Sequence, residues 1–140
     1  MVDIFTPEKR SKIMASIRGK DTKIEILLRK ALWRGGVRGY RLNVKLPGKP
    51  DIVFPKYKIA IFCDGDFWHG KDFDEWKERL SHHWKEKIQK NIERDKKNDS
   101  QLFNAKWIVL HFWESEILES MDDCLIKIKK TIREQGLNLE

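Results

Sequence analysis

The sequence predicts a single α/β domain in which helices flank a mixed β-sheet. Apolar residues recur at spacings of three and four in segments near both ends of the chain and in one long central segment, which is typical of helices packed on a core. Between these segments lie short apolar runs bounded by proline and glycine, which are typical of strands. A chain of 140 residues is long enough for one full core and too short for two, so we expect residues 1–140 to form one domain.

The chain is basic, with a formal net charge of +7 at pH 7 and a pI of about 9.4. Lysine and arginine gain affinity for polyanions by displacing counterions from phosphates, so nucleic acid is the partner that we expect first. A membrane surface is the alternative for a basic protein. The sequence shows neither an apolar run of membrane-spanning length nor a signal peptide, so we expect a cytoplasmic protein.

The two cysteines, Cys63 and Cys124, are far apart and form no CxxC pair. This usage supports neither a disulfide framework nor a cysteine-based zinc site, and it fits a reducing compartment. Cys124 lies on an apolar helical face, where we expect a core residue.

The first helix is expected to be a basic one. Thr6-Pro7-Glu8 supplies a cap, a proline at the first helical position and an acid in the first turn. Its charges include Arg10 and Lys12. Two interpretations are open: a solvated face on a packed helix, or an arm over residues 1–20 that lies against DNA.

A second helix is expected from Asp21, as its cap, to the stop at Gly35-Gly36. Its apolar stripe predicts a core helix and consists of Ile24, Leu27, Leu28, Ala31 and Leu32. Glu25 lies at the edge of that stripe. It is either a surface acid or a carboxylate turned toward a site.

Three strands are expected next. Tyr40, Leu42, Val44 and Leu46 alternate with polar residues, which predicts a half-buried strand over 40–46. Two apolar runs, 51–54 and 57–63, are bounded by Pro55 and Gly65 and predict strands that are covered on both faces. Together they predict a meander of three strands.

The second half of the chain alternates helix and strand. A helical turn from Phe73 to Leu80 precedes a long charged helix that Ser81 caps and that runs from His82 to about Phe103. A strand over 107–112 and a closing helix over 117–132 follow. Asp95 lies on the inward stripe of the long helix. A buried carboxylate is costly without a partner, so we expect it to pair with a cation, a histidine or a metal.

The densest chemistry lies between Pro47 and His69, where an acidic residue enters one strand and a loop follows the next. Asp51 is the candidate ligand for a divalent ion that hydrolyses phosphodiesters, although a turn role is the alternative for a Pro-Asp pair. His69 is a candidate base if a carboxylate fixes its tautomer; otherwise it is a surface residue. Phe67 and Trp68 lie in a glycine-bounded loop, where we expect exposed rings that stack on bases or wedge between them, with partial burial as the alternative.

These segments resemble the very short patch repair (Vsr) DNA mismatch endonucleases, a branch of the restriction-endonuclease-like nucleases. The resemblance covers most of the chain. Its blocks are Arg10-Ser11-Lys12-Ile13-Met14, Asp21-Thr22-Lys23-Ile24-Glu25, Leu46-Pro47-Gly48-Lys49-Pro50-Asp51, Phe67-Trp68-His69, Lys87-Ile88-Gln89-Lys90-Asn91-Ile92-Glu93-Arg94-Asp95 and Trp107-Ile108-Val109-Leu110.

The resemblance implies a restriction-endonuclease-like, PD-(D/E)XK-type core. It also implies an Mg²⁺-dependent monomer that nicks one strand of double-stranded DNA 5′ to the thymine of a T:G mismatch and so begins very short patch repair. Two alternatives stay open: a sequence-specific restriction or homing-type endonuclease of the same fold, and a catalytically silent DNA-binding module.

The resemblance also implies roles for individual residues. Asp51 and the backbone carbonyl of Cys63 would hold the metal. His69 would be the general base, oriented by Asp95, and Glu25 would support the site. The expected DNA contacts are Arg10, Lys12, Met14, Phe67, Trp68 and Trp84.

Two departures from the family pattern lead to further expectations. The family's structural zinc uses cysteines and a histidine at places that carry Asp66, Lys71, Phe73 and Ser115 in this sequence, so we expect no structural zinc. Asp64 stands where the family has a histidine that pairs with the acid at Glu25. We expect Asp64 to serve the site by binding metal or by facing a lysine. We also expect a raised pKa on one of the two carboxylates, Glu25 or Asp64.

Overall fold

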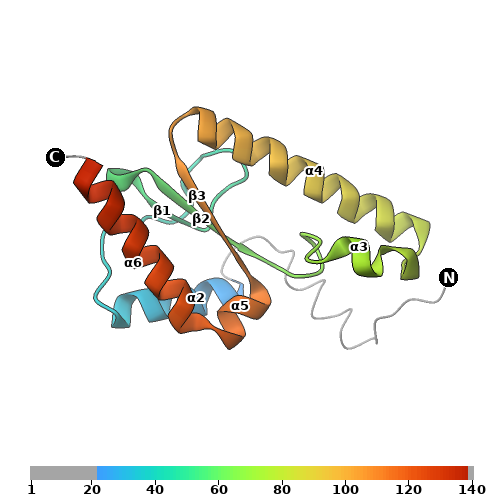
Figure 1. Ribbon diagram of the computed structural model, residues 1–140, viewed down its shortest axis with the longest axis horizontal. Helices are drawn as coiled ribbons and strands as arrows, with labels where there is room; N and C mark the ends of the chain where they lie inside the picture. The colour runs from blue at the N-terminus through green and yellow to red at the C-terminus, as the bar shows by residue number, and fades with distance from the viewer. Residues whose placement is uncertain (1–21, 139–140) are drawn as a thin grey trace.

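The computed structural model describes residues 22–138, and these form one mixed sheet flanked by helices (Figure 1). The strands of the sheet are β1 (Ile52–Phe54), β2 (Ile59–Asp64) and β3 (Ile108–Trp113). They lie in the order β1-β2-β3, with β1 antiparallel and β3 parallel to the central β2. The prediction of an α/β fold with a mixed sheet is therefore confirmed.

One face of the sheet is covered by α2 (Lys23–Arg34), α5 (Glu114–Glu119) and α6 (Met121–Asn138), as Figure 1 shows. Alternation along the strands turns Ile59 and Ile61 toward these helices, together with Phe112. These side chains form the main core with buried residues of the three helices, which are Ile24, Leu28, Leu32, Ile117, Cys124 and Ile128. Cys124 is thus a core residue, as expected.

The opposite face is covered by α4 (His82–Asn104). Ala60 and Phe62, which alternate with the residues of the main core, pack there against Leu102 of α4. Asp64 follows Phe62 at the next position of this face, and its strand ends there. The alternation of side chains along β2 therefore places Asp64 on the face that α4 covers.

The chain between β2 and α4 is anchored by aromatic and aliphatic packing. It contains α3 (Phe73–Trp76) and a 3-10 turn over Lys77–Arg79. Phe73 and Leu80 are buried against Ile88 of α4. The loop that follows β2 is therefore held on the N-terminal half of α4.

The predicted strand over 40–46 is wrong. The structure has a single β-bridge there, between Arg41 and Val53, and the meander of three strands is absent. Asn43 adopts a left-handed conformation with φ 58°, which breaks the extended backbone, and Leu42 is exposed. The alternation of polar and apolar residues in the sequence does not reveal that the backbone at Asn43 is left-handed.

Two helix boundaries also differ from the predictions. Helix α2 has Thr22 in the N-cap position, whereas the predicted cap, Asp21, lies outside the described residues together with the arm over 1–20. The closing helix is divided at Ser120, whose non-helical backbone separates α5 from α6. Helix α4 begins after Ser81 as predicted. Within 22–138, no helix has the length and apolar character needed to cross a membrane.

Gly70 fixes the contact between the β2–α3 loop and α4. Its φ of +73° is left-handed, and a Cβ built there would lie 2.5 Å from Cδ1 of Ile92. We expect Gly70→Ala to destabilise the protein by roughly 2–4 kcal/mol, because left-handed strain and overpacking add. Urea unfolding followed by tryptophan fluorescence measures this change.

Two other glycines separate the causes. Gly36→Ala carries the same left-handed strain without a clash, and Gly65→Ala carries neither. We expect a loss of about 1 kcal/mol for the first and little change for the second. Equal losses for Gly70→Ala and Gly36→Ala would show that the packing of Gly70 on Ile92 contributes nothing.

Candidate active site

The candidate site lies where β1 begins and β2 ends. Because these strands are antiparallel, Asp51, directly before β1, lies beside the end of β2. The Asp51 amide donates to the carbonyl of Ile61, at 2.9 Å. The amide of Cys63 donates to Oδ2 of Asp51, at 2.6 Å. The backbone thus holds the Asp51 carboxylate at the end of the sheet.

Glu25 comes to the same place from the first turn of α2. It is buried, and its Oε1 accepts a hydrogen bond from Thr22 Oγ1 at 3.1 Å. Burial raises the pKa of Asp51 to about 8; the Cys63 hydrogen bond opposes this, and the nearby Glu25 carboxylate adds to it. Of the two interpretations open for Glu25, the structure supports a carboxylate turned toward the site.

This concentration of acidic oxygen suits a hard divalent cation. Two neighbouring carboxylates in a buried place repel one another, and a bound cation would remove that repulsion. Among the residues that the structure describes, no group of three or more His, Cys, Asp or Glu side chains is arranged to hold a metal ion. Magnesium needs only one or two carboxylates beside its waters and substrate phosphates, so Asp51 and its surroundings fit this ion.

His69 and Asp95, which lie 26 residues apart, meet on the α4 side of the site. Nδ1 of His69 is 2.6 Å from Oδ2 of Asp95. A neutral imidazole that donates from Nδ1 keeps its lone pair on Nε2, which is the arrangement a general base requires. Burial lowers the pKa of His69, but the Asp95 hydrogen bond and the charges of Asp64 and Asp95 outweigh it and raise the pKa above 6.5.

Sequence reasoning missed two residues of the site, His111 in β3 and Asp99 in α4. His111 Nδ1 lies 2.6 Å from Oδ2 of Asp64, and its Nε2 lies 2.7 Å from Oδ2 of Asp99. Burial lowers the pKa of His111, but hydrogen bonds to these two carboxylates outweigh it and raise the pKa to about 9. The expectation that Asp64 faces a lysine is therefore wrong, because its partner is an imidazole.

Two signals in the sequence point to these residues. His111 is the one ionisable residue inside the apolar run 107–112, and Asp99 follows Asp95 by one helical turn. Alternation places His111 on the same face as Phe62 and Asp64, toward α4. The pKa of Asp51 is raised to about 8, chiefly by burial, and the charges of Glu25 and Asp64 both contribute.

The loop aromatics are packed rather than exposed. Phe67, Trp68, Trp76 and Trp84 contact one another with ring centroids 5.3–5.8 Å apart. Trp68 is only 7% exposed, so the expectation that its ring does not fill a core is wrong. The side-chain amide of Asn91 donates to the Trp68 carbonyl, at 3.1 Å, which also ties the loop to α4. Loops generally run over the surface, but here the Trp68 ring packs on Trp84 of α4.

Comparison with known proteins matches residues 2–75 to the family described as DNA mismatch endonuclease Vsr. The chain belongs to the Vsr endonuclease family. A type II nicking enzyme of Neisseria meningitidis serogroup C, V.NmeDIP, is 40% identical over 98% of this chain and 95% of its own length. V.HpaIIP of Haemophilus parainfluenzae, also a type II nicking enzyme, is 41% identical over 96% of this chain and 98% of its own length.

The DNA mismatch endonuclease Vsr of Escherichia coli strain K12 is 38% identical over 81% of this chain and 74% of its own length. The three relatives match 81–98% of this chain, and the family and these relatives are named as endonucleases or nicking enzymes. The chain is therefore a strand-nicking endonuclease.

The positions at which the Vsr resemblance places zinc ligands carry a polar network here. Asp66 Oδ1 accepts hydrogen bonds from the amide and the hydroxyl of Ser115, at 3.3 and 3.4 Å. Lys71 Nζ donates to the same hydroxyl. Phe73, at the remaining position, is buried against α4. Hydrogen bonds thus join the β2–α3 loop to the start of α5.

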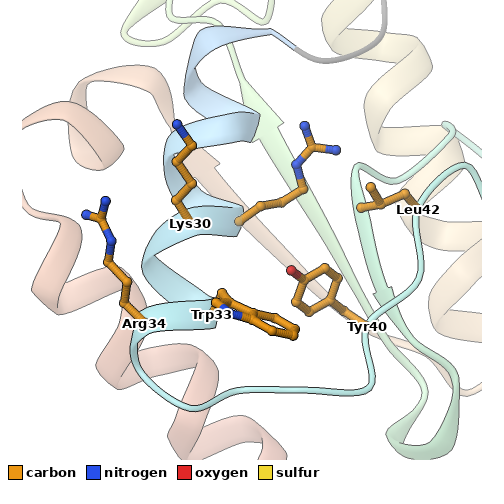
Figure 2. A pocket seen from close by; sticks show the side chains of 6 residues that line it. Lys30, Trp33, Arg34, Tyr40 and Leu42 are labelled. Carbon is orange, nitrogen blue, oxygen red and sulfur yellow. The ribbon is translucent and has the colours of Figure 1, made fainter.

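A basic and aromatic hollow of about 480 Å³ lies along α2 (Figure 2). Figure 2 shows Trp33 of α2 beside Tyr40 of the following segment, while Lys30 and Arg34 extend from the other side of the same helix. Trp33 is 56% exposed, and the Arg38 guanidinium stacks 3.3 Å above its ring. The hollow therefore combines positive charge with accessible aromatic surface. Arg10, Lys12 and Met14 lie outside the described residues.

The Asp95 hydrogen bond predicts how His69 titrates. We expect NMR titration of the His69 ring to give a pKa above 6.5, and Asp95→Asn to lower that pKa, because the variant removes a charge that stabilises the imidazolium. Asp122→Asn, in the exposed first turn of α6, is the matched control and leaves His69 unchanged. An unchanged His69 pKa in Asp95→Asn would contradict the pairing.

Proposed function

We propose that this Vsr-family endonuclease is an Mg²⁺-dependent enzyme that nicks one strand of duplex DNA 5′ to the thymine of a T:G mismatch and so starts very short patch repair. The observation that carries the proposal is the His69–Asp95 pair near the half-buried Asp51 and the buried Glu25. The names of the relatives, which are type II nicking enzymes and a DNA mismatch endonuclease, support the same activity. We expect a cytoplasmic monomer, since a nick needs one active site.

Asp51 and the backbone carbonyl of Cys63 are the groups proposed to hold magnesium. Both offer oxygen, and the Cys63 amide already fixes the Asp51 carboxylate. When bound, magnesium would stabilise the negative charge that develops on the scissile phosphate. The Glu25 carboxylate lies close enough to add to the raised pKa of Asp51. A bound magnesium ion would displace the proton from Asp51 and would be attracted by both carboxylates. We also propose that the protein holds no structural zinc, and the Asp66–Ser115 hydrogen bonds at these positions support this proposal.

His69 is proposed as the general base. Its Nε2 takes a proton from the attacking water, and the imidazolium that forms is stabilised by the carboxylate of Asp95 at 2.6 Å. Asp95 also fixes the tautomer, because it accepts the single Nδ1 proton of the neutral ring. Asp64 contributes a buried negative charge whose nearer oxygen is 3.9 Å from Nδ1.

The DNA contacts are proposed to come from the aromatic cluster and the N-terminal arm. Phe67 and Trp84 are half-buried, so part of each side chain is exposed for contact with a base pair. Trp68 is buried, so its insertion requires the β2–α3 loop to open first. Met14, Arg10 and Lys12 are proposed as contacts from the other side of the duplex.

The hollow along α2 is proposed to hold the phosphates of flanking DNA. Glu25 and Arg34 lie on the same helix, and nine residues of helix span roughly 14 Å. A duplex whose scissile phosphate is at Asp51 would therefore have neighbouring phosphates within reach of Lys30 and Arg34. Trp33 offers a flat apolar surface for a sugar or a base beside them.

Mismatch-dependent nicking is the central prediction. With Mg²⁺ and labelled duplexes that differ only in one T:G pair, we expect one strand of the mismatched duplex to be cut, and Asp51→Ala to reduce the rate by at least about 100-fold. Denaturing gel electrophoresis measures the product.

The same assay separates the two alternatives. Equal cutting of a matched duplex would favour a sequence-specific endonuclease, and binding without any cut would favour a silent DNA-binding module. Undiminished nicking by Asp51→Ala would place the metal elsewhere.

The α2 hollow predicts a salt-dependent contribution to binding. We expect Lys30→Ala together with Arg34→Ala to weaken DNA binding, and to reduce the slope of log K against log salt by about 0.9 for each phosphate that the variant no longer neutralises. Fluorescence anisotropy with labelled duplex measures both. Lys127→Ala with Lys130→Ala, on exposed α6 positions, removes equal charge. An equal weakening in this control would assign the effect to net charge alone.

A further inference from the structure

Two imidazole–carboxylate pairs lie side by side at the ends of β2 and β3, and α4 supplies the carboxylate of each. Asp95 and Asp99 are one helical turn apart, so both point from the same face of α4. Asp95 meets His69 of the loop at 2.6 Å, and Asp99 meets His111 of β3 at 2.7 Å. Only the first pair has a role in the mechanism given above.

Asp64 joins the two pairs. Its Oδ2 is 2.6 Å from Nδ1 of His111, and its Oδ1 is 3.9 Å from Nδ1 of His69. The residue is only 4% exposed. The five side chains therefore form a continuous chain in the order Asp99, His111, Asp64, His69, Asp95.

His111 is held rigidly within this chain. Both of its ring nitrogens face carboxylates, and its ring stacks on Phe62 with centroids 4.7 Å apart and an interplanar angle of 14°. Its position on the strand is fixed by pairing, because Phe62 is its register partner in β2. A ring fixed in this way holds the Asp64 carboxylate in one orientation.

The orientation of Asp64 matters because His69 Nδ1 carries only one proton. Asp95 and Asp64 are both acceptors near that nitrogen, at 2.6 and 3.9 Å. By hydrogen-bonding Oδ2, His111 draws Asp64 toward β3 and leaves the Nδ1 proton to Asp95. Without His111, a buried and uncompensated Asp64 would turn to the nearest donor, which is His69.

We propose that His111 and Asp99 are positioning residues of the active site, which hold Asp64 away from Nδ1 of His69 and so keep the base in its working orientation. This inference rests on the proposed function where it is tested by nicking kinetics, whereas its test by NMR of His69 does not depend on that function. Stability alone does not explain the arrangement, because buried ion pairs are often no more stable than apolar residues of the same volume. An apolar side chain at 111 would continue the apolar strand.

Kinetics of nicking under saturating and subsaturating duplex test the proposal. His111→Phe keeps a ring on Phe62 and removes both donors, and Asp99→Ala removes the outer carboxylate while sparing the strand. We expect each to lower kcat about tenfold with KM within about twofold of wild type, because outer hydrogen-bond partners of a working imidazole commonly contribute 10–100-fold. Asp99→Asn, which keeps an acceptor, should lose less than Asp99→Ala.

A ring-specific ¹⁵N–¹H NMR spectrum supplies a readout that does not depend on activity. We expect wild-type His69 to show the Nδ1-protonated tautomer and both His111→Phe and Asp99→Ala to change its ¹⁵N shifts. Asp122→Asn is the matched control for Asp99→Ala, and it leaves both rings and kcat unchanged. Asp99 lies on a helix surface and is partly exposed, so the Asp99 variants remain informative if His111→Phe does not fold.

Wild-type kcat in both Asp99→Ala and His111→Phe, or lost activity with unchanged His69 shifts, would overturn the proposal. Failure of the proposed function looks different. In that case wild type and Asp51→Ala are equally inactive or equally active on DNA, and the His69 shifts alone decide whether His111 and Asp99 position the ring.

Discussion

The parallel pairing of β2 with β3 is the constraint on which the candidate active site depends. It aligns the ends of the two strands, so that Asp64 pairs in register with Trp113 and His111 lies two positions earlier on the same face. A parallel pair also requires a long crossover, and here the crossover contains the β2–α3 loop and α4. The segment that permits the pairing therefore brings His69, Asp95 and Asp99 over the strand ends.

The carboxylates of the site occur in two arrangements, one beside another carboxylate and one beside an imidazole. Asp51 and Glu25 lie close enough for the Glu25 charge to add to the effect of burial, which raises the pKa of Asp51 to about 8. Asp64 instead meets His111, an imidazole bonded on both sides. A bound cation would relieve the repulsion between Asp51 and Glu25. The charge of Asp64, in contrast, is already paired with His111 in the free protein. The proposed cation position at Asp51 and Glu25 therefore lies beside a hydrogen-bonded group, Asp64 and His111, that needs no cation.

Sequence reasoning located the parts of the site that depend on local pattern. Asp95 interrupts an inward helical stripe, which required a partner, and the structure supplies His69. It failed where tertiary contacts decide. The left-handed backbone of Asn43 interrupts a segment whose alternation predicts a strand, and Trp68 is buried where its ring packs on Trp84 of α4. The partnership of Asp64 with His111 was missed because strand pairing, and not sequence distance, brings residues 64 and 111 together.

The pairing of β2 with β3 also accounts for the departure of this chain at Asp64. The Vsr resemblance places a histidine at that position, and replacing it by an acid alone would bury a further negative charge near Glu25 and Asp51. Here an imidazole comes from β3 at a position on the same face of the sheet, and Asp99 of α4 fixes its other nitrogen. An imidazole and a carboxylate are thus in contact at the end of β2, with the carboxylate on β2 and the imidazole on β3. The residue at position 64 does not by itself reveal this imidazole, whereas the register of β2 with β3 places His111 on the same face as Asp64.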